Sequence, residues 1–207
     1  MNTTNLALAQ KMASLQGALF EQNCSVALEC AGFEISGRHV LMKEIGIEVD
    51  IIATNQQGIS FFITCKGSMR GDRPGARRTD TLKKALCDAF LLSLEGWTPV
   101  ILMTSHVPDK GSGRAMLDAV PRSVLYDVVN PWNHSARLQW LAVARETEIQ
   151  QDMLRSPQDV YAKNWQLTPS HPNAKLAFPK NAHMVERLLA EVGTLTGSHG
   201  KDTDMPR

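Results

Sequence analysis

The sequence contains no apolar run that approaches the ~20 residues with which a helix crosses a bilayer. Its N-terminal sequence, MNTTNLALAQKM, lacks a basic segment followed by a long apolar core, so we expect no secretory signal. The four cysteines show no CxxC spacing and no neighbouring histidine pattern, which favours reduced, buried thiols over a zinc site. From these absences we expect a cytoplasmic protein.

Several nucleotide-binding and hydrolase motifs are also missing. The chain has neither a GxSxG elbow nor a GxxxxGK[ST] loop, and Gly111-Ser112-Gly113 does not fit a dinucleotide fingerprint. A formal net charge of +1 does not predict a polyanionic partner from bulk charge. Any nucleic-acid site must therefore come from a local cluster of basic residues.

What is present is an ordinary globular composition, 43% hydrophobic and 21% charged over 207 residues, with clear periodicity. Apolar residues recur at helical spacing from Leu8 to Leu19, and residues 55–58 (NQQG) predict a hairpin turn between two strands. The order of elements, α-β-β-β-α-β-α-β, predicts an α/β fold with a central mixed β-sheet flanked by helices. We predict helices over residues 4–31, 79–94 and 111–120, and strands over 33–42, 47–53, 59–66, 100–103 and 124–129.

The C-terminal third is less regular. Leu138 and Leu141 give helical spacing to residues 136–154, and residues 181–192 predict a last helix, with four prolines between the two. The sequence after residue 195 is polar, which favours disorder. We therefore expect a core over residues 1–130, a mostly helical extension over 131–195 packed on that core, and a disordered tail over 196–207.

Chemistry is indicated by five residues: Glu21, Glu48, Asp50, Thr64 and Lys66. Residues two apart in a strand face the same way, so Glu48 shares a face with Asp50, and Thr64 shares one with Lys66. If residues 55–58 close a hairpin, Asp50 lies near Thr64. Two carboxylates and an ammonium then share one small region, which suits a divalent cation that activates water.

Three segments resemble the restriction-endonuclease-like PD-(D/E)xK nuclease superfamily: residues 17–35, 46–68 and 77–92. The resemblance implies that the core is restriction-endonuclease-like and that Glu21 is the helix acid, Asp50 the central metal ligand and Lys66 the motif lysine. It also implies hydrolysis of DNA phosphodiester bonds with Mg²⁺ or Mn²⁺, favouring an endonuclease, and a homodimer for double-strand cleavage. The sequence leaves RNA as the substrate and exonuclease action as open alternatives.

The sequence departs from the family pattern at Thr64, where an acid is expected. The main-chain carbonyl of Cys65 and the carboxylate of Glu48 are the candidates to complete the metal site, although an exposed strand carboxylate is an equal interpretation of Glu48. A structural ion pair with Lys66 is the alternative for Asp50. Two further hypotheses remain open. The first is a catalytically inactive nuclease fold that binds nucleic acid or a protein, and the second is an unrelated α/β protein in which these residues do not converge.

A basic, glycine-containing segment follows the motif strand. Such a segment suits contacts to DNA phosphates, which position a duplex without reading its sequence, although a solvated charged face is the plainer alternative. The C-terminal extension is a candidate surface for a protein partner. The predicted DNA-contacting residues are Arg70, Arg73, Arg77, Arg78, Lys83 and Lys84.

Overall fold

A five-stranded mixed sheet forms the centre of the computed structural model, which describes residues 3–69, 75–158 and 160. These residues belong to one compact unit, Met1–Ser170. The strands lie in sequence order; β1, β2 and β3 are antiparallel, and β3, β4 and β5 are parallel. This confirms the predicted α/β class. The strands are β1 (Glu34–Met42), β2 (Ile47–Thr54), β3 (Ser60–Lys66), β4 (Val100–Thr104) and β5 (Asp127–Val129).

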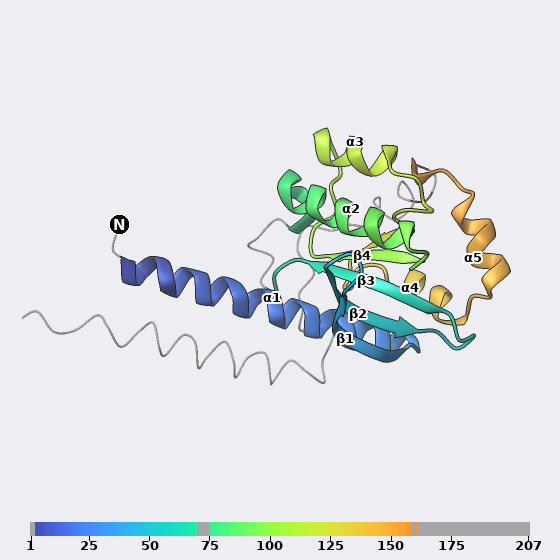
Figure 1. The fold of residues 1–207 in the computed structure, drawn as a ribbon, viewed down its shortest axis with the longest axis horizontal. Coiled ribbons are helices and arrows are strands. Elements are labelled where there is room, and N and C mark those ends of the chain that lie inside the picture. The colour runs from blue at the N-terminus through green and yellow to red at the C-terminus, as the bar shows by residue number, and fades with distance from the viewer. Residues whose placement is uncertain (1–2, 70–74, 159, 161–207) are drawn as a thin grey trace, which may run out of the picture. The chain divides into compact units, whose positions relative to one another are not determined.

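Helices cover both faces of the sheet (Figure 1). Helices α2 and α3 contact each other, and α2 also contacts β3 and β4; α1 contacts the first three strands and α4. None of the helices within the described residues is long and apolar enough to cross a membrane. The helices are α1 (Thr3–Ala31), α2 (Thr79–Leu94), α3 (Gly111–Ala119), α4 (Ser135–Val143) and α5 (Glu146–Met153), with a 3-10 turn at Gly75–Arg77.

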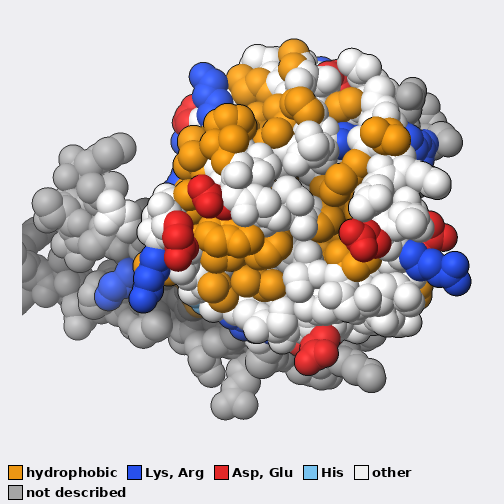
Figure 2. Space-filling model, turned by 45° about the vertical axis from the view of Figure 1, so that its right-hand side comes forward, with side chains coloured by type: hydrophobic (Ala, Val, Ile, Leu, Met, Phe, Trp, Pro, Cys, Tyr) orange, Lys and Arg blue, Asp and Glu red, His pale blue; other side chains and the backbone are white. Residues whose placement is uncertain are grey.

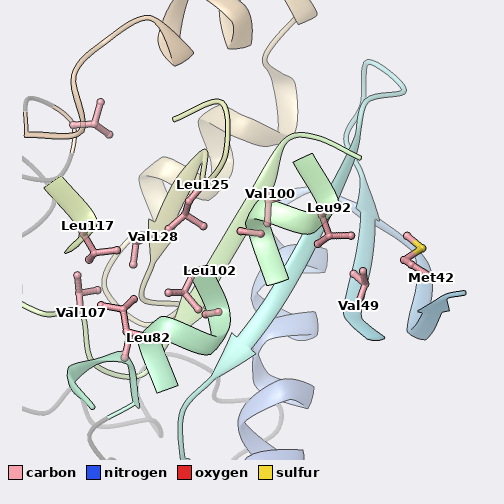
Figure 3. Close-up of a cluster of buried hydrophobic side chains, with 14 residues drawn as sticks. Met42, Val49, Leu82, Leu92, Val100, Leu102, Val107, Leu117, Leu125 and Val128 are labelled. Atoms are coloured by element: carbon pink, nitrogen blue, oxygen red, sulfur yellow. The ribbon is translucent and has the colours of Figure 1, made fainter. Parts of the chain in front are cut away.

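The core beneath α2 buries the strand predicted over residues 100–103, whose residues are all apolar. All five residues of β4 are buried. Figure 3 shows Leu82 and Leu92 of α2 directed at Val100 and Leu102 of β4, with Val128 of β5 beside them. The other face of the sheet packs aromatic rings, with Phe33 edge-on to Phe61 at 5.5 Å. Burying apolar surface on both faces fixes the carboxyl ends of β3 and β4 relative to each other.

Two predicted boundaries are wrong. The helix predicted over residues 136–154 is two helices, because Ala144 is extended and a new N-terminus forms where Glu148 accepts a hydrogen bond from the Arg145 amide at 2.7 Å. The strand predicted over residues 124–129 begins only at Asp127, because the amides of Val124 and Leu125 close a turn onto the Pro121 carbonyl. The helix predicted over residues 181–192 and the tail over 196–207 lie outside the described residues.

Candidate active site at the separation of β2 and β3

Asp50 lies where β2 and β3 separate. The paired ladder between these strands runs from Thr54 opposite Ser60 to Ile51 opposite Ile63 and stops there. Asp50 is the next residue, and its Oδ2 atom accepts a hydrogen bond from the Cys65 amide at 2.5 Å. A carboxylate therefore takes the place that a backbone carbonyl would hold in a continued ladder.

Two further groups on β3 donate to the same oxygen. Thr64 Oγ1 lies 3.3 Å and Lys66 Nζ 3.4 Å from Asp50 Oδ2. The predicted approach of Thr64 to Asp50 is thus present, and the Thr64 hydroxyl acts as a donor to the carboxylate. Because the N–H and C=O of a strand residue point to the same side, the Cys65 carbonyl also faces the β2 side, as its predicted role as a ligand requires.

Glu21 reaches the site from α1. Its Oε1 atom lies 3.0 Å from Nε2 of His39, and its side chain is only 17% exposed. Burial raises the pKa of Glu21, and the neighbouring Asp50 carboxylate raises it further, against smaller opposing effects of His39 and Arg38. The two acids are therefore close enough to repel each other, and a cation between them would relieve that repulsion.

His39 is a site residue that the sequence did not reveal. On β1 it lies between Arg38, which pairs with Ile51, and Val40, which pairs with Val49, so it is opposite Asp50. Its Nδ1 atom lies 3.1 Å from Glu48 Oε1. The hydrogen bond with Glu48, followed by the charge of Glu21, raises the pKa of the His39 imidazole. Locating His39 from sequence would have required the register of β1, which the β2–β3 turn does not define.

The donor set fits a divalent cation. Glu21, His39 and Asp50 each offer one ligand atom, and these atoms all lie within 4.8 Å of one another. Carboxylate oxygens suit Mg²⁺ and Mn²⁺, and an imidazole nitrogen suits Mn²⁺ and later first-row metals. Glu48 does not belong to this group; its carboxylate instead contacts the far side of the His39 ring.

A second set of charges comes from α2. Burial raises the pKa of Asp88, while the charges of Lys66 and then Lys84 act in the opposite direction. Asp88 was not anticipated from the sequence, because a single acid within a helix gives no signal. Asp88 lies just beyond the midpoint of α2, so the charged groups around the site extend from the sheet onto that helix.

The predicted DNA-contacting residues divide into three groups. Lys83 and Lys84 are exposed on α2. Arg77 pairs with Asp109 at 3.6 Å, and Arg78 pairs with Asp80 at 3.5 Å, in both cases on the surface. Arg70 and Arg73 lie outside the described residues.

The structure brings Glu21, Asp50 and Lys66 together with Thr64 and Cys65, and it places Glu48 one contact further out, behind His39. The unrelated-fold hypothesis required Glu21, Asp50 and Lys66 to lie apart, and they do not. Comparison of the chain with protein-family models, with curated proteins and with solved structures finds no match.

Proposed function

We propose that this chain is a metal-dependent nuclease that hydrolyses DNA phosphodiester bonds as an endonuclease. The observation that carries the proposal is the convergence of Asp50, Lys66 and Glu21 at the point where β2 and β3 separate, with Lys66 Nζ 3.4 Å from Asp50 Oδ2. The segment resemblance to the PD-(D/E)xK nucleases supports the same activity, because it assigns roles to these three residues.

Each residue has a chemical task in this proposal. Asp50 and Glu21, with the Cys65 carbonyl, would hold Mg²⁺ or Mn²⁺, which lowers the pKa of a bound water and neutralises charge on a phosphate oxygen. The Lys66 ammonium, 20% exposed, orients the attacking water and stabilises the negative charge that develops on the phosphate. The acids repel a free polyanion, so the substrate needs the neighbouring basic residues to approach.

DNA is the proposed substrate because exposed cations border the site. Lys83 and Lys84 lie on the first turns of α2, and the segment that joins β3 to α2 carries four arginines. Cations of this kind neutralise backbone phosphates, so binding weakens steeply as salt rises. Contacts to phosphates give no sequence preference, and we propose none.

A homodimer is part of the proposal, because each site cuts one strand. Phe90 and Leu94, one helical turn apart on α2, expose 49% and 64% of their surfaces. Hydrophobic side chains gather into patches over the face drawn in Figure 2, between scattered acidic and basic groups. Exposed apolar patches of this kind mark protein contacts, which supports an interface between two copies or with another protein partner.

One observation favours a second function. Thr64 supplies a hydroxyl where the nuclease pattern has a carboxylate, and a hydroxyl is a weaker ligand for a hard cation. The alternative is therefore a catalytically inactive nuclease fold that binds nucleic acid or a protein. It predicts DNA binding without hydrolysis.

A cleavage assay separates the two functions. Purified protein would be incubated with supercoiled plasmid in Mg²⁺, Mn²⁺ or EDTA, beside Asp50→Asn and a control, Glu29→Gln, which removes an acid of α1 that pairs with Arg38 at 3.7 Å. We expect nicking that requires metal, falls at least about 100-fold in Asp50→Asn and is unchanged in Glu29→Gln. DNA binding without cleavage in either metal would establish the inactive fold instead.

A further inference from the structure

His39 has a backbone conformation that is unusual within a strand. Its φ of 49° is the only positive φ of a non-glycine residue in the part of the chain that the structure describes. The left-handed region is disfavoured for most side chains, although histidine enters it more readily than β-branched residues do. A residue held in this way in an edge strand needs compensating contacts, and those contacts are its two carboxylate neighbours.

The His39 imidazole lies between two carboxylates, the partly buried one of Glu21 and the exposed one of Glu48. Nε2 lies 3.0 Å from Glu21 Oε1, while Nδ1 lies 3.1 Å from Glu48 Oε1. When Nδ1 donates to Glu48, the lone pair on Nε2 points towards Glu21 and Asp50. Histidines that bind metals show the same arrangement, in which an outer carboxylate fixes the tautomer and the ring orientation.

The distances between the three candidate ligand atoms are slightly longer than those around a bound ion. The ligand atoms of Glu21, His39 and Asp50 lie within 4.8 Å of one another. Two ligands bound at about 2.1 Å to opposite sides of one ion are about 4.2 Å apart. A largest separation of 4.8 Å is therefore close to the span of the ligand shell of one ion, and the exposed His39 and partly buried Glu21 are the side chains that would adjust.

His39 also supplies what Thr64 lacks. Asp50 has β3 on one side, where Thr64 offers a hydroxyl, and β1 on the other, where His39 offers a nitrogen. A third strong protein ligand is therefore available from the opposite neighbouring strand. Its nitrogen changes the preferred ion, because Mg²⁺ and Ca²⁺ select oxygen donors whereas Mn²⁺, Co²⁺ and Zn²⁺ accept imidazole.

We propose that Glu21, His39 and Asp50 form a site for a first-row transition-metal dication, preferred over Mg²⁺, with Glu48 as the positioning residue for His39. The role of this ion in cleavage rests on the proposed nuclease function, but its binding does not. The competing interpretation is that His39 is protonated and only bridges Glu21 and Glu48 as an ion pair.

The test measures Mn²⁺ binding to the full-length protein by EPR, with pulsed detection of nitrogen coupling to the ion. We expect one site that binds Mn²⁺ at least about 10-fold more tightly than Mg²⁺ in competition, with an imidazole nitrogen coupling. His39→Asn, which tolerates a positive φ, loses at least about 10-fold in affinity together with the nitrogen coupling. Glu48→Gln weakens binding about 10-fold but retains the coupling, and Glu29→Gln leaves both unchanged.

The outcomes are distinct from those of the cleavage assay. Mn²⁺ binding without nitrogen coupling, equal binding by His39→Asn, or no binding at all overturns the inference. Binding through His39 in a protein that cuts no plasmid supports the inference and removes the nuclease proposal. If His39→Asn leaves both cleavage in Mg²⁺ and Mn²⁺ binding unchanged, the nuclease proposal is supported and the inference about His39 is overturned. Circular dichroism of each variant verifies that the fold is kept, and Glu21→Gln tests the same site from α1 if His39→Asn does not fold.

Discussion

At the scale of single residues, the hydroxyl of Thr64 determines the charge balance of the site. The Thr64 residue is 5% exposed, and its hydroxyl donates to a carboxylate oxygen of Asp50 at 3.3 Å. An acid at position 64 would place another anion beside Asp50 and near Glu21. Burial and the charge of Asp50 already raise the pKa of Glu21. Without a bound metal, threonine at position 64 therefore stabilises the fold more than an acid would, but it removes one carboxylate ligand for a metal.

Thr64→Glu tests this balance. In the absence of metal we expect a loss of about 1–3 kcal/mol in the free energy of unfolding, because the new carboxylate repels Asp50. In Mg²⁺ we expect at least about 10-fold tighter ion binding, because the site gains an anionic oxygen ligand. Thermal unfolding with and without Mg²⁺ measures both effects. The control is Thr64→Gln, which introduces an uncharged side chain of the same length as glutamate. An equal effect of Mg²⁺ on the stability of the two variants would contradict the argument.

Sequence reasoning identified the residues whose proximity depends on local structure. Asp50 and Thr64 meet because a four-residue turn sets the register of one hairpin, and Lys66 follows two residues after Thr64. The position of His39 depends on the pairing of β1 with β2, which contains a register shift between Ile35 and Gly37. It also depends on a positive φ that no local sequence pattern predicts. A bulge moves a side chain by one position, so its target could not be predicted from alternation.

At the scale of elements, the connection from β3 to α2 depends on one glycine. A Cβ on Gly75, whose φ is 48°, would lie 2.6 Å from Thr104 Oγ1 and 2.9 Å from the Lys66 carbonyl oxygen. Thr104 also donates to that carbonyl at 2.7 Å. The end of the β3–α2 connection is thus packed against the last residues of β3 and β4, and this contact positions the start of α2.

Gly75→Ala is expected to destabilise the protein by about 3 kcal/mol or more, because it combines a strained φ with a clash against backbone. Gly58→Ala provides the matched control, since Gly58 also has a positive φ, 80°, but nothing lies within 4 Å of its Cβ position. That variant should lose only about 1–2 kcal/mol. Urea denaturation of both proteins gives the comparison, and equal losses would show that the packing around Gly75 is not restrictive.

The turn between β2 and β3 is anchored by an element from the C-terminal part. Asn55 Nδ2 donates to the carbonyl oxygens of Leu141 and Ala144, at 2.9 Å each. The sequence predicted the turn but not this anchor, because a contact between positions 86 and 89 residues apart leaves no periodic signal. The end of α4 therefore supports the hairpin whose other end carries Asp50.

At the scale of the whole molecule, one buried acid joins the C-terminal helices to the sheet. Asp152 of α5 accepts hydrogen bonds from Arg122 at 2.9 Å, from Tyr126 at 2.9 Å and from Arg137 at 2.5 Å. Arg137 also contacts Asp127 of β5 at 2.5 Å. Burial alone would raise the pKa of Asp152, but the hydrogen bonds from Arg122 and Arg137 outweigh it, and the pKa lies well below its usual value.

Acid should therefore weaken the fold through Asp152. The unfolded chain takes up a proton near pH 4, whereas the folded carboxylate stays ionised. Its contribution to stability is thus fully present above about pH 4 and is lost as the pH falls towards the folded pKa. We expect the free energy of unfolding of the native protein to decline below pH 4 and that of Asp152→Asn to decline less, as measured by urea titrations across this range.

At neutral pH, Asp152→Asn should cost about 3–5 kcal/mol, because it leaves the fully buried Arg122 guanidinium without its charged partner. Asp118→Asn is the control, since it removes a partly exposed ion pair with Arg114 and should cost less than about 1 kcal/mol. Similar losses in the two variants would mean that burial does not distinguish these pairs.

The three donors on Oδ2 of Asp50 also have an entropic consequence. Ordering a flexible side chain on binding costs about 0.5–1.5 kcal/mol, and here that ordering takes place when the sheet forms. A cation that arrives at Asp50 meets a carboxylate whose rotamer is already selected. The remaining loss of side-chain entropy on ion binding comes from Glu21 and His39. The rigidity of α1 and β1, which carry these residues, therefore sets the affinity for the ion and the rate at which it binds.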